Sequence, residues 1–265
     1  MITRVLAALV GLAVVIPAIL WGGQAAVLAL AGLAVVVGAD EYVRMATPDD
    51  RAGGLAVVGG GGLALFATLS LAPVAWHAPL GGLLLVAVFL NGVLRPGADL
   101  AEAAARVGKH ALGLGWVGGF LAFLPLLREL GLGWVFLALV IPWLGDTGGY
   151  FSGRAFGKHK MYPKLSPKKT WEGLAGGLTL TVAGVFALRY LVLDVLSPVD
   201  AVVLGLVLGA MAALGDLAES LLKRAYGVKD SGRFMPGHGG LLDRIDSLLF
   251  VAPLLYAYAV LIKGL

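Results

Sequence analysis

The chain has 265 residues, of which 59% are hydrophobic and only 14% are charged. With a mean hydropathy of +0.92, this composition excludes a soluble globular domain, because so much apolar surface requires lipid as its solvent. The formal net charge is +4, and the absence of cysteine excludes disulfides and thiolate-bound metals, so any bound metal needs oxygen or histidine ligands.

Apolar stretches of about 20 residues recur along the whole chain, a length that matches the thickness of a bilayer. They predict transmembrane helices near 3–21, 24–42, 54–75, 79–94, 110–128, 131–151, 171–192, 199–224 and 246–262. We therefore expect an all-α polytopic membrane protein with about nine helices. We treat 1–265 as a single transmembrane domain, with a helical scaffold at 1–109 and catalytic helices at 110–265. The forty glycines are typical of membrane helices, which approach one another through small residues.

Basic residues gather on one side of this predicted topology. Arg4 and the connections at 43–53, 95–109, 152–170 and 223–244 hold 17 of the 20 lysines and arginines. By the positive-inside rule this side is cytoplasmic, which places the N-terminus in the cytoplasm and the C-terminus outside. We expect a multi-pass protein of the cell membrane whose active site faces the cytoplasm.

The first polar cluster in chain order begins near the end of the sixth predicted span, 131–151, and continues beyond it. It contains Asp146 among glycines and then a basic segment with Lys168 and Lys169. Glycine lets backbone N–H groups approach a phosphate closely, and Thr170 is placed to cap a helix that starts at Trp171. The cluster therefore predicts a phosphate site, although a basic loop that only contacts anionic headgroups is an alternative interpretation.

Carboxylates lie at the predicted cytoplasmic ends of several spans, where burial costs free energy unless the charge is paired or hydrated. They are Asp146, Glu172, Asp216, Glu219, Asp243 and Asp246. Any one of them can reach the interface or a basic partner, but six together indicate a site. Asp216, Glu219, Ser220 and Lys223 share a helix face by their spacing, and Asp243 and Asp246 are one turn apart. Hard oxygen ligands of this kind favour Mg²⁺, and the cation in turn attracts phosphate.

A continuous motif joins these two helix faces. It reads Ser220-x-x-Lys223-Arg224-x4-Lys229-Asp230-Ser231-Gly232-x-x-Met235-Pro236-Gly237-His238-Gly239-Gly240-x-x-Asp243-Arg244-x-Asp246. This motif resembles the signature of the CDP-diacylglycerol synthases, also called phosphatidate cytidylyltransferases. The segments around Asp146 and at 166–173 resemble the same family, which carries a branched aliphatic residue where this chain has Met235.

The resemblance implies transfer of a cytidylyl group from CTP to phosphatidic acid in the cytoplasmic leaflet. It implies a paired-cation site, with Mg²⁺ and a second cation such as K⁺, and a homodimer without a nucleic-acid partner. Carried onto this chain, Asp216 and Asp243 are principal Mg²⁺ ligands, and Asp246 completes or orients the metal site. Glu219 either supports these ligands or binds another cation. The expected catalytic residues are Asp216, Lys223, His238, Asp243 and Asp246. The expected substrate-binding residues are Asp146, Lys168, Lys169, Ser220, Arg224, Lys229, Asp230 and Arg233.

Several alternatives stay open at this point. His238 is either a metal ligand or proton donor, or it orders its glycine-rich turn. The nearest alternative function is a cytidylyltransferase for another lipid phosphate. A CDP-alcohol phosphotransferase would need a longer aspartate pattern than 243–246 provides. A transporter would place its carboxylates near the membrane midplane, whereas these are grouped at one face.

Overall fold

The computed structural model describes residues 2–95, 99–234 and 239–265. Its α-helices are α1 (Ile2–Trp21), α2 (Gly23–Ala46), α3 (Arg51–Gly54), α4 (Gly61–Leu71), α5 (His77–Leu94), α6 (Leu100–Gly113), α7 (Phe123–Leu130), α8 (Leu132–Phe156), α9 (Trp171–Leu191), α10 (Pro198–Ala225) and α11 (Leu242–Leu261). Four short helical turns adjoin them: η1 (Pro48–Asp50), η2 (Leu55–Gly60), η3 (Val74–Trp76) and η4 (Leu114–Gly119). The strands β1 (Lys160–Tyr162) and β2 (Ser166–Thr170) form an antiparallel hairpin.

Most of these helices are long and apolar enough to cross a bilayer. Within the described residues eight helical stretches meet that condition: Gly23–Ala46, Pro48–Leu71, Val74–Leu94, Leu100–Leu130, Leu132–Phe156, Trp171–Leu191, Pro198–Ala225 and Leu242–Leu261. The helix α1 adds a further apolar stretch of 20 residues. The prediction of an all-α polytopic membrane protein is confirmed.

The basic connection expected at 152–170 has more regular structure than the sequence indicated. Helix α8 continues to Phe156, and the β1–β2 hairpin fills most of the remainder, with Lys160 opposite Thr170. The apolar part of α8 ends where its charged residues begin, so hydropathy indicates only the part of the helix that suits hydrocarbon.

The chain divides into two compact units. The N-terminal unit consists of Met1–Leu126 and Asp230–Asp243, and the C-terminal unit consists of Leu127–Lys229 and Arg244–Leu265. The predicted division of roles between a scaffold at 1–109 and catalytic helices at 110–265 stays a prediction.

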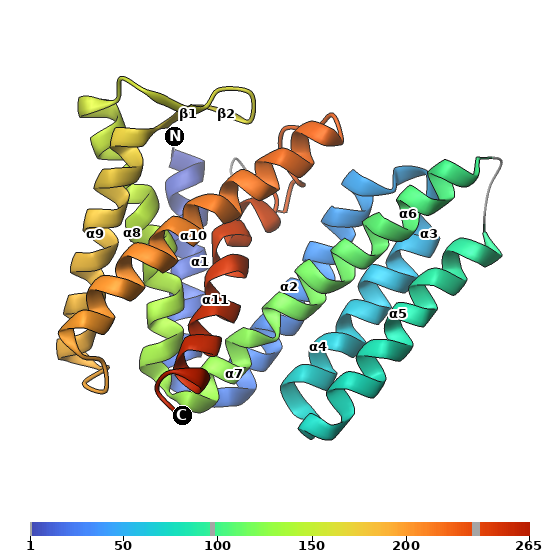
Figure 1. Ribbon diagram of the computed structural model, residues 1–265, viewed down its shortest axis with the longest axis horizontal. Coiled ribbons are helices and arrows are strands. Elements are labelled where there is room, and N and C mark those ends of the chain that lie inside the picture. Colours follow the sequence, from blue (N-terminus) through green and yellow to red (C-terminus); the bar gives the residue numbers. More distant parts are fainter. Residues whose placement is uncertain (1, 96–98, 235–238) are drawn as a thin grey trace. The chain divides into compact units, whose positions relative to one another are not determined.

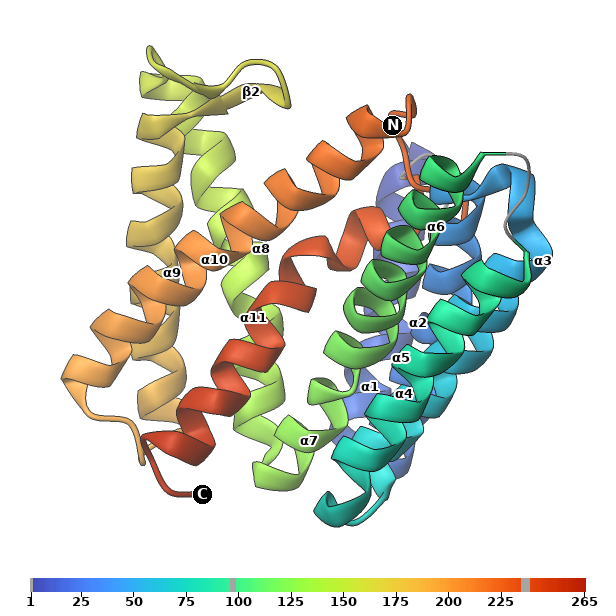
Figure 2. The same cartoon turned by 45° about the vertical axis from the view of Figure 1, so that its right-hand side comes forward.

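Close backbone approaches between glycines hold the N-terminal unit together. A Cβ added to Gly118 in η4 would lie 2.6 Å from the Gly62 Cα of α4, so only glycine permits this approach. The buried Tyr42 of α2 donates a hydrogen bond to the Lys109 carbonyl at 2.8 Å and meets the Trp116 ring edge to face. Figure 2 shows α4, α5 and α6 side by side in this unit.

A glycine seam joins α8 to α9 in the C-terminal unit. A Cβ added to Gly148 would lie 2.6 Å from the Gly176 carbonyl oxygen, and one added to Gly177 would lie 2.7 Å from the Gly145 carbonyl oxygen. Helix α10 packs against both α8 and α9, and the β1–β2 hairpin lies at the end of α8 and the start of α9 (Figure 1). The seam therefore fixes the two helices that carry the hairpin.

Candidate active site

A cavity of about 340 Å³ lies in the C-terminal unit among α8, α9, α10 and the hairpin. Its polar lining includes Asp146, Arg154, Lys168 and Lys169. Its apolar lining comes from residues farther along the helices, such as Pro142, Leu174, Leu178 and Ala212. The cavity is therefore basic at its hairpin end and, apart from Asp146, mainly apolar along the helices. This lining suits a molecule with an anionic head and a hydrocarbon body.

Local capping positions the basic strand over the cavity. The Thr170 hydroxyl accepts a hydrogen bond from the Gly173 N–H at 3.1 Å, which confirms the predicted cap of the helix that starts at Trp171. In the first turn of α9, the Glu172 carboxylate accepts the Lys158 N–H at 3.1 Å and pairs with His159 Nδ1 at 2.6 Å. The hairpin is thus tied to the first turn of α9 at both of its ends.

Lys169 connects this strand to the carboxylates of α10. Its Nζ lies 2.9 Å from Asp216 Oδ2 and donates to the Ala213 carbonyl at 3.2 Å. The Ser220 hydroxyl donates to Asp216 Oδ1 at 3.3 Å. The structure therefore brings together three residues predicted from two separate motifs.

Asp216 and Asp246 lie where α10 and α11 cross. A Cβ at Gly215 would lie 2.9 Å from the Asp246 carbonyl oxygen, so glycine permits the close crossing. The carboxylate of Asp246 is near enough to those of Asp216 and Asp146 for their negative charges to repel. Its Oδ1 also accepts the Ser247 N–H at 2.6 Å. Three predicted site carboxylates thus share one region of the C-terminal unit.

The donor set at this crossing fits a hard divalent cation by its chemistry. Among the described residues, no group of three or more His, Cys, Asp or Glu side chains is arranged to hold a metal ion. Mg²⁺, however, is commonly bound by one or two carboxylates, with water and substrate phosphate completing the octahedron. Asp216 and Asp246 supply two such carboxylates, and their mutual repulsion would be relieved by a cation.

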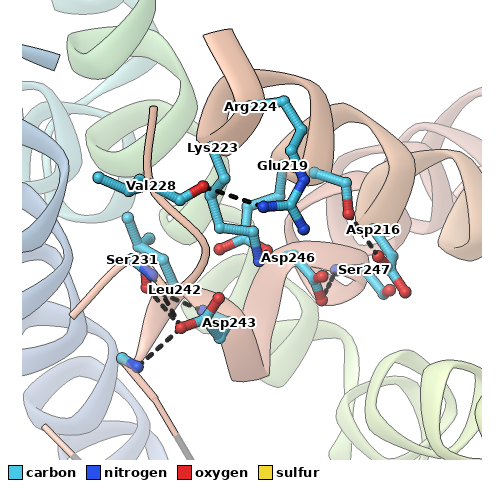
Figure 3. Close-up of polar contacts among 12 residues, drawn as sticks. Asp216, Glu219, Lys223, Arg224, Val228, Ser231, Leu242, Asp243, Asp246 and Ser247 are labelled. Carbon is cyan, nitrogen blue, oxygen red and sulfur yellow. Dashed lines mark hydrogen bonds and ion pairs between the residues drawn. The ribbon is translucent and has the colours of Figure 1, made fainter. Parts of the chain in front are cut away.

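Glu219 and Lys223 form a buried ion pair on α10. Glu219 is completely buried, and Lys223 Nζ lies 2.5 Å from its Oε2 (Figure 3). Arg224, one residue later, is exposed and donates to the Val228 carbonyl at 3.2 Å. The predicted roles of Glu219 in metal binding and of Lys223 and Arg224 toward phosphate stay predictions.

Asp243 makes its described hydrogen bonds within the N-terminal unit. Its Oδ2 accepts the N–H groups of Ser231 and Gly240 at 2.9 and 2.8 Å, and the Ser231 hydroxyl lies 3.0 Å away (Figure 3). This carboxylate joins Ser231 to Gly240, a role that the sequence did not indicate. Its predicted role as a metal ligand remains a prediction.

The remaining predicted residues of the motif lie in the same segment or just before it. Lys229, Asp230 and Arg233 are exposed, and their predicted roles in substrate binding stay predictions. His238 and Met235 lie outside the described residues. Glu41 of α2, which sequence reasoning missed, accepts hydrogen bonds from the Leu241 and Leu242 N–H groups. Its only sequence signal was a carboxylate inside the expected span 24–42.

The chain is similar to known proteins, both as a family and individually. A profile of the Cytidylyltransferase family matches residues 2–262. Proteins named phosphatidate cytidylyltransferase are similar over shorter stretches. The Bacillus subtilis protein is 45% identical over 49% of this chain and 48% of its own length. The Staphylococcus aureus protein is 47% identical over 52% of each chain. The Thermotoga maritima protein is 39% identical over 67% of this chain and 69% of its own. The chain thus spans about half the length of the first two relatives.

Proposed function

The chain belongs to the cytidylyltransferase family, and from this membership we propose that it is a phosphatidate cytidylyltransferase of phospholipid biosynthesis. It would transfer a cytidylyl group from CTP to phosphatidic acid, giving CDP-diacylglycerol and pyrophosphate. The names of three relatives, at 39% to 47% identity, support this substrate pair.

The observation that carries the proposal is the cavity of the C-terminal unit. Arg154, Lys168 and Lys169 supply positive charge at the hairpin end, while Leu174 and Leu178 extend an apolar wall along α9. A lipid phosphate matches this division, because its head needs charge-assisted hydrogen bonds and its glycerol and acyl carbons need apolar contact. A free nucleotide alone would leave the apolar wall without a partner.

The reaction requires the chain to bring two anions together. An oxygen of the lipid phosphate forms a bond to the α-phosphorus of CTP, and the bond from that phosphorus to the bridging β-oxygen breaks. Pyrophosphate leaves with the electron pair. The attacking oxygen is already anionic near neutral pH, so no strong general base is required. Lys168, Lys169 and Arg154 therefore act by binding and orienting a phosphate against electrostatic repulsion.

We propose that Asp216 and Asp246 hold Mg²⁺, with Asp243 as a further ligand. When bound, the cation screens the phosphate charges and stabilises the departing pyrophosphate. Lys169, whose Nζ contacts Asp216, would hold that carboxylate in place until phosphate and cation arrive. A second cation such as K⁺ belongs to the same proposal.

The setting of the enzyme is proposed on the same grounds. CTP would arrive from the cytosol, and phosphatidic acid would enter from the cytoplasmic leaflet of the cell membrane, with the hairpin on the cytoplasmic side. A homodimer is proposed from the resemblance and from the prevalence of twofold assemblies. The second candidate function, cytidylyl transfer to another lipid phosphate, is favoured equally by the cavity's basic and apolar lining.

A substrate panel separates these two functions. The purified full chain in detergent is incubated with Mg²⁺ and CTP, together with phosphatidic acid, an ether-linked isoprenoid phosphatidate analogue, or diacylglycerol without phosphate. We expect turnover with phosphatidic acid that exceeds turnover with the ether-linked lipid, and none with diacylglycerol. Preference for the ether-linked lipid would favour the second function, and no turnover with any lipid phosphate would contradict both.

A further inference from the structure

A buried carboxylate far from the signature motif in sequence holds that motif in place. Glu41 lies in α2 and is only 5% exposed. Its Oε1 accepts the Leu241 N–H at 2.9 Å, and its Oε2 accepts the Leu242 N–H at 2.9 Å. Because α11 begins at Leu242, these donors belong to the helix start, whose N–H groups have no partner within the helix. Glu41 therefore caps α11 from another helix.

The motif is shaped to let this carboxylate approach. A Cβ added to Gly232 would lie 2.5 Å from Glu41 Oε1, and one added to Gly240 would lie 2.5 Å from Oε2. Any larger residue at either position would push the carboxylate away from the helix start. Contact with Glu41 thus explains Gly232, and contact with both Glu41 and the Ser231 hydroxyl explains Gly240.

Ser231 connects Glu41 to Asp243. Its hydroxyl lies 3.3 Å from Glu41 Oε2 and 3.0 Å from Asp243 Oδ2, and its N–H donates to Asp243. A hydroxyl has one proton, so it can donate to only one of the two carboxylates at a time. The orientation of Asp243 therefore depends on Ser231, which Glu41 also contacts.

We propose that Glu41 is a positioning residue, which holds Ser231, Gly232 and the start of α11 so that Asp243 is presented in one orientation. Its carboxylate acts through Asp243 and through the backbone, without touching substrate. Negative charge at a helix start is also favoured by the helix dipole, so the carboxylate is better suited here than a neutral amide. The consequence for turnover rests on the proposed cytidylyltransferase function, whereas the consequence for backbone order does not.

The chain offers a closely matched control. Asp40 is the neighbouring residue on α2, and its carboxylate is partly exposed and pairs with Arg44 and Arg51 at 2.7 and 2.8 Å. Glu41→Gln and Asp40→Asn make the same chemical change one residue apart. Only the first touches the signature segment.

Hydrogen–deuterium exchange of the full chain in detergent tests the backbone claim without substrate or metal. For Glu41→Gln we expect amide exchange of peptides covering Ser231, Leu241 and Leu242 to be faster by about tenfold. In Glu41→Gln, amide exchange in α8, α9 and α10 should equal that of the unchanged protein. In Asp40→Asn, amide exchange should be unchanged throughout. Equal exchange in both variants, or faster exchange spread evenly over α8 to α10, would overturn the proposal.

Kinetics with CTP and phosphatidic acid test the link to the reaction. We expect Glu41→Gln to lower kcat by about tenfold or more with little change in KM, and Asp40→Asn to leave both unchanged. A rise in KM at normal kcat would overturn the positioning role. If the unchanged protein gave no turnover, the proposed function would fail while the exchange result still decided the role of Glu41. If Glu41→Gln did not fold, Ser231→Ala would carry the same comparison, with a smaller local rise in exchange expected.

Discussion

At the scale of single residues, the two units use carboxylates in two different ways. In the N-terminal unit, Glu41 and Asp243 accept backbone N–H groups and thereby order a segment. In the C-terminal unit, Asp216 and Asp246 lie near each other at a helix crossing, where their negative charges repel. Backbone N–H groups satisfy the first pair. In the second pair Lys169 offsets the charge of Asp216, and a bound cation would offset the charge of both carboxylates.

Replacing either carboxylate at the crossing should abolish activity. We expect Asp216→Asn and Asp246→Asn to lower kcat by about 100-fold or more at saturating Mg²⁺, because each removes a negative oxygen ligand. Asp194→Asn is the control, since Asp194 is exposed between α9 and α10. Near-normal kcat in both variants would rule out the proposed metal site.

Lys168 should act in substrate binding. It lines the cavity, whereas Lys164 lies in the turn of the same hairpin and does not line it. We expect Lys168→Gln to raise KM for phosphatidic acid about tenfold with little change in kcat, because one charge-assisted hydrogen bond to phosphate is lost. Lys164→Gln should leave KM unchanged. An equal effect of both substitutions on KM would indicate general attraction of anionic lipid instead of a specific contact.

At the scale of elements, the sequence predicted some features well and others not at all. The cap at Thr170 and the helix that starts at Trp171 followed from local chemistry, and the structure confirms both. The β1–β2 hairpin was missed, because it is short and charged and its strands pair only with each other. The sequence also did not predict the capping of α11 by Glu41, because the residues that it joins are about 200 positions apart in the chain.

The glycine seam between α8 and α9 gives a prediction about stability. We expect Gly148→Ala to lower the free energy of unfolding by about 1–3 kcal/mol, because the new methyl would meet backbone atoms that cannot rotate away. Gly145→Ala is the control, since its Cβ would meet only a Thr181 methyl at 3.7 Å. Equilibrium unfolding of both variants in detergent micelles measures the difference. Equal free energies of unfolding for the two variants would show that α8 and α9 can move apart without loss of stability.

At the scale of the whole molecule, hydropathy was sufficient for fold class but not for the site. The apolar stretches predicted the membrane-spanning helices, and the signature motif predicted the family, which the profile match confirms. Side-chain contacts between motifs, such as Lys169 with Asp216, depend on how helices pack, and spacing along one segment contains no information about that packing. The orientation in the membrane remains a prediction from charge.

Cysteine labelling tests this orientation cleanly, because the chain has no cysteine of its own. Single cysteines replace Lys164 in the hairpin and Asp194 between α9 and α10, both of which are exposed. In intact cells, we expect a membrane-impermeant maleimide to label the second position and to label the first only after the membrane is opened. The reverse pattern would place the basic loops outside and contradict a cytosolic source of CTP.

The central claim is that the lipid acquires the α-phosphorus of CTP, and the position of the label tests it most directly. The purified full chain is given phosphatidic acid, Mg²⁺ and CTP labelled with ³²P at either the α or the γ position. We predict label in the lipid from α-labelled CTP only, with the γ label recovered as pyrophosphate. Transfer of the γ label to lipid would reveal a kinase, and lipid without label from either nucleotide would contradict cytidylyl transfer altogether.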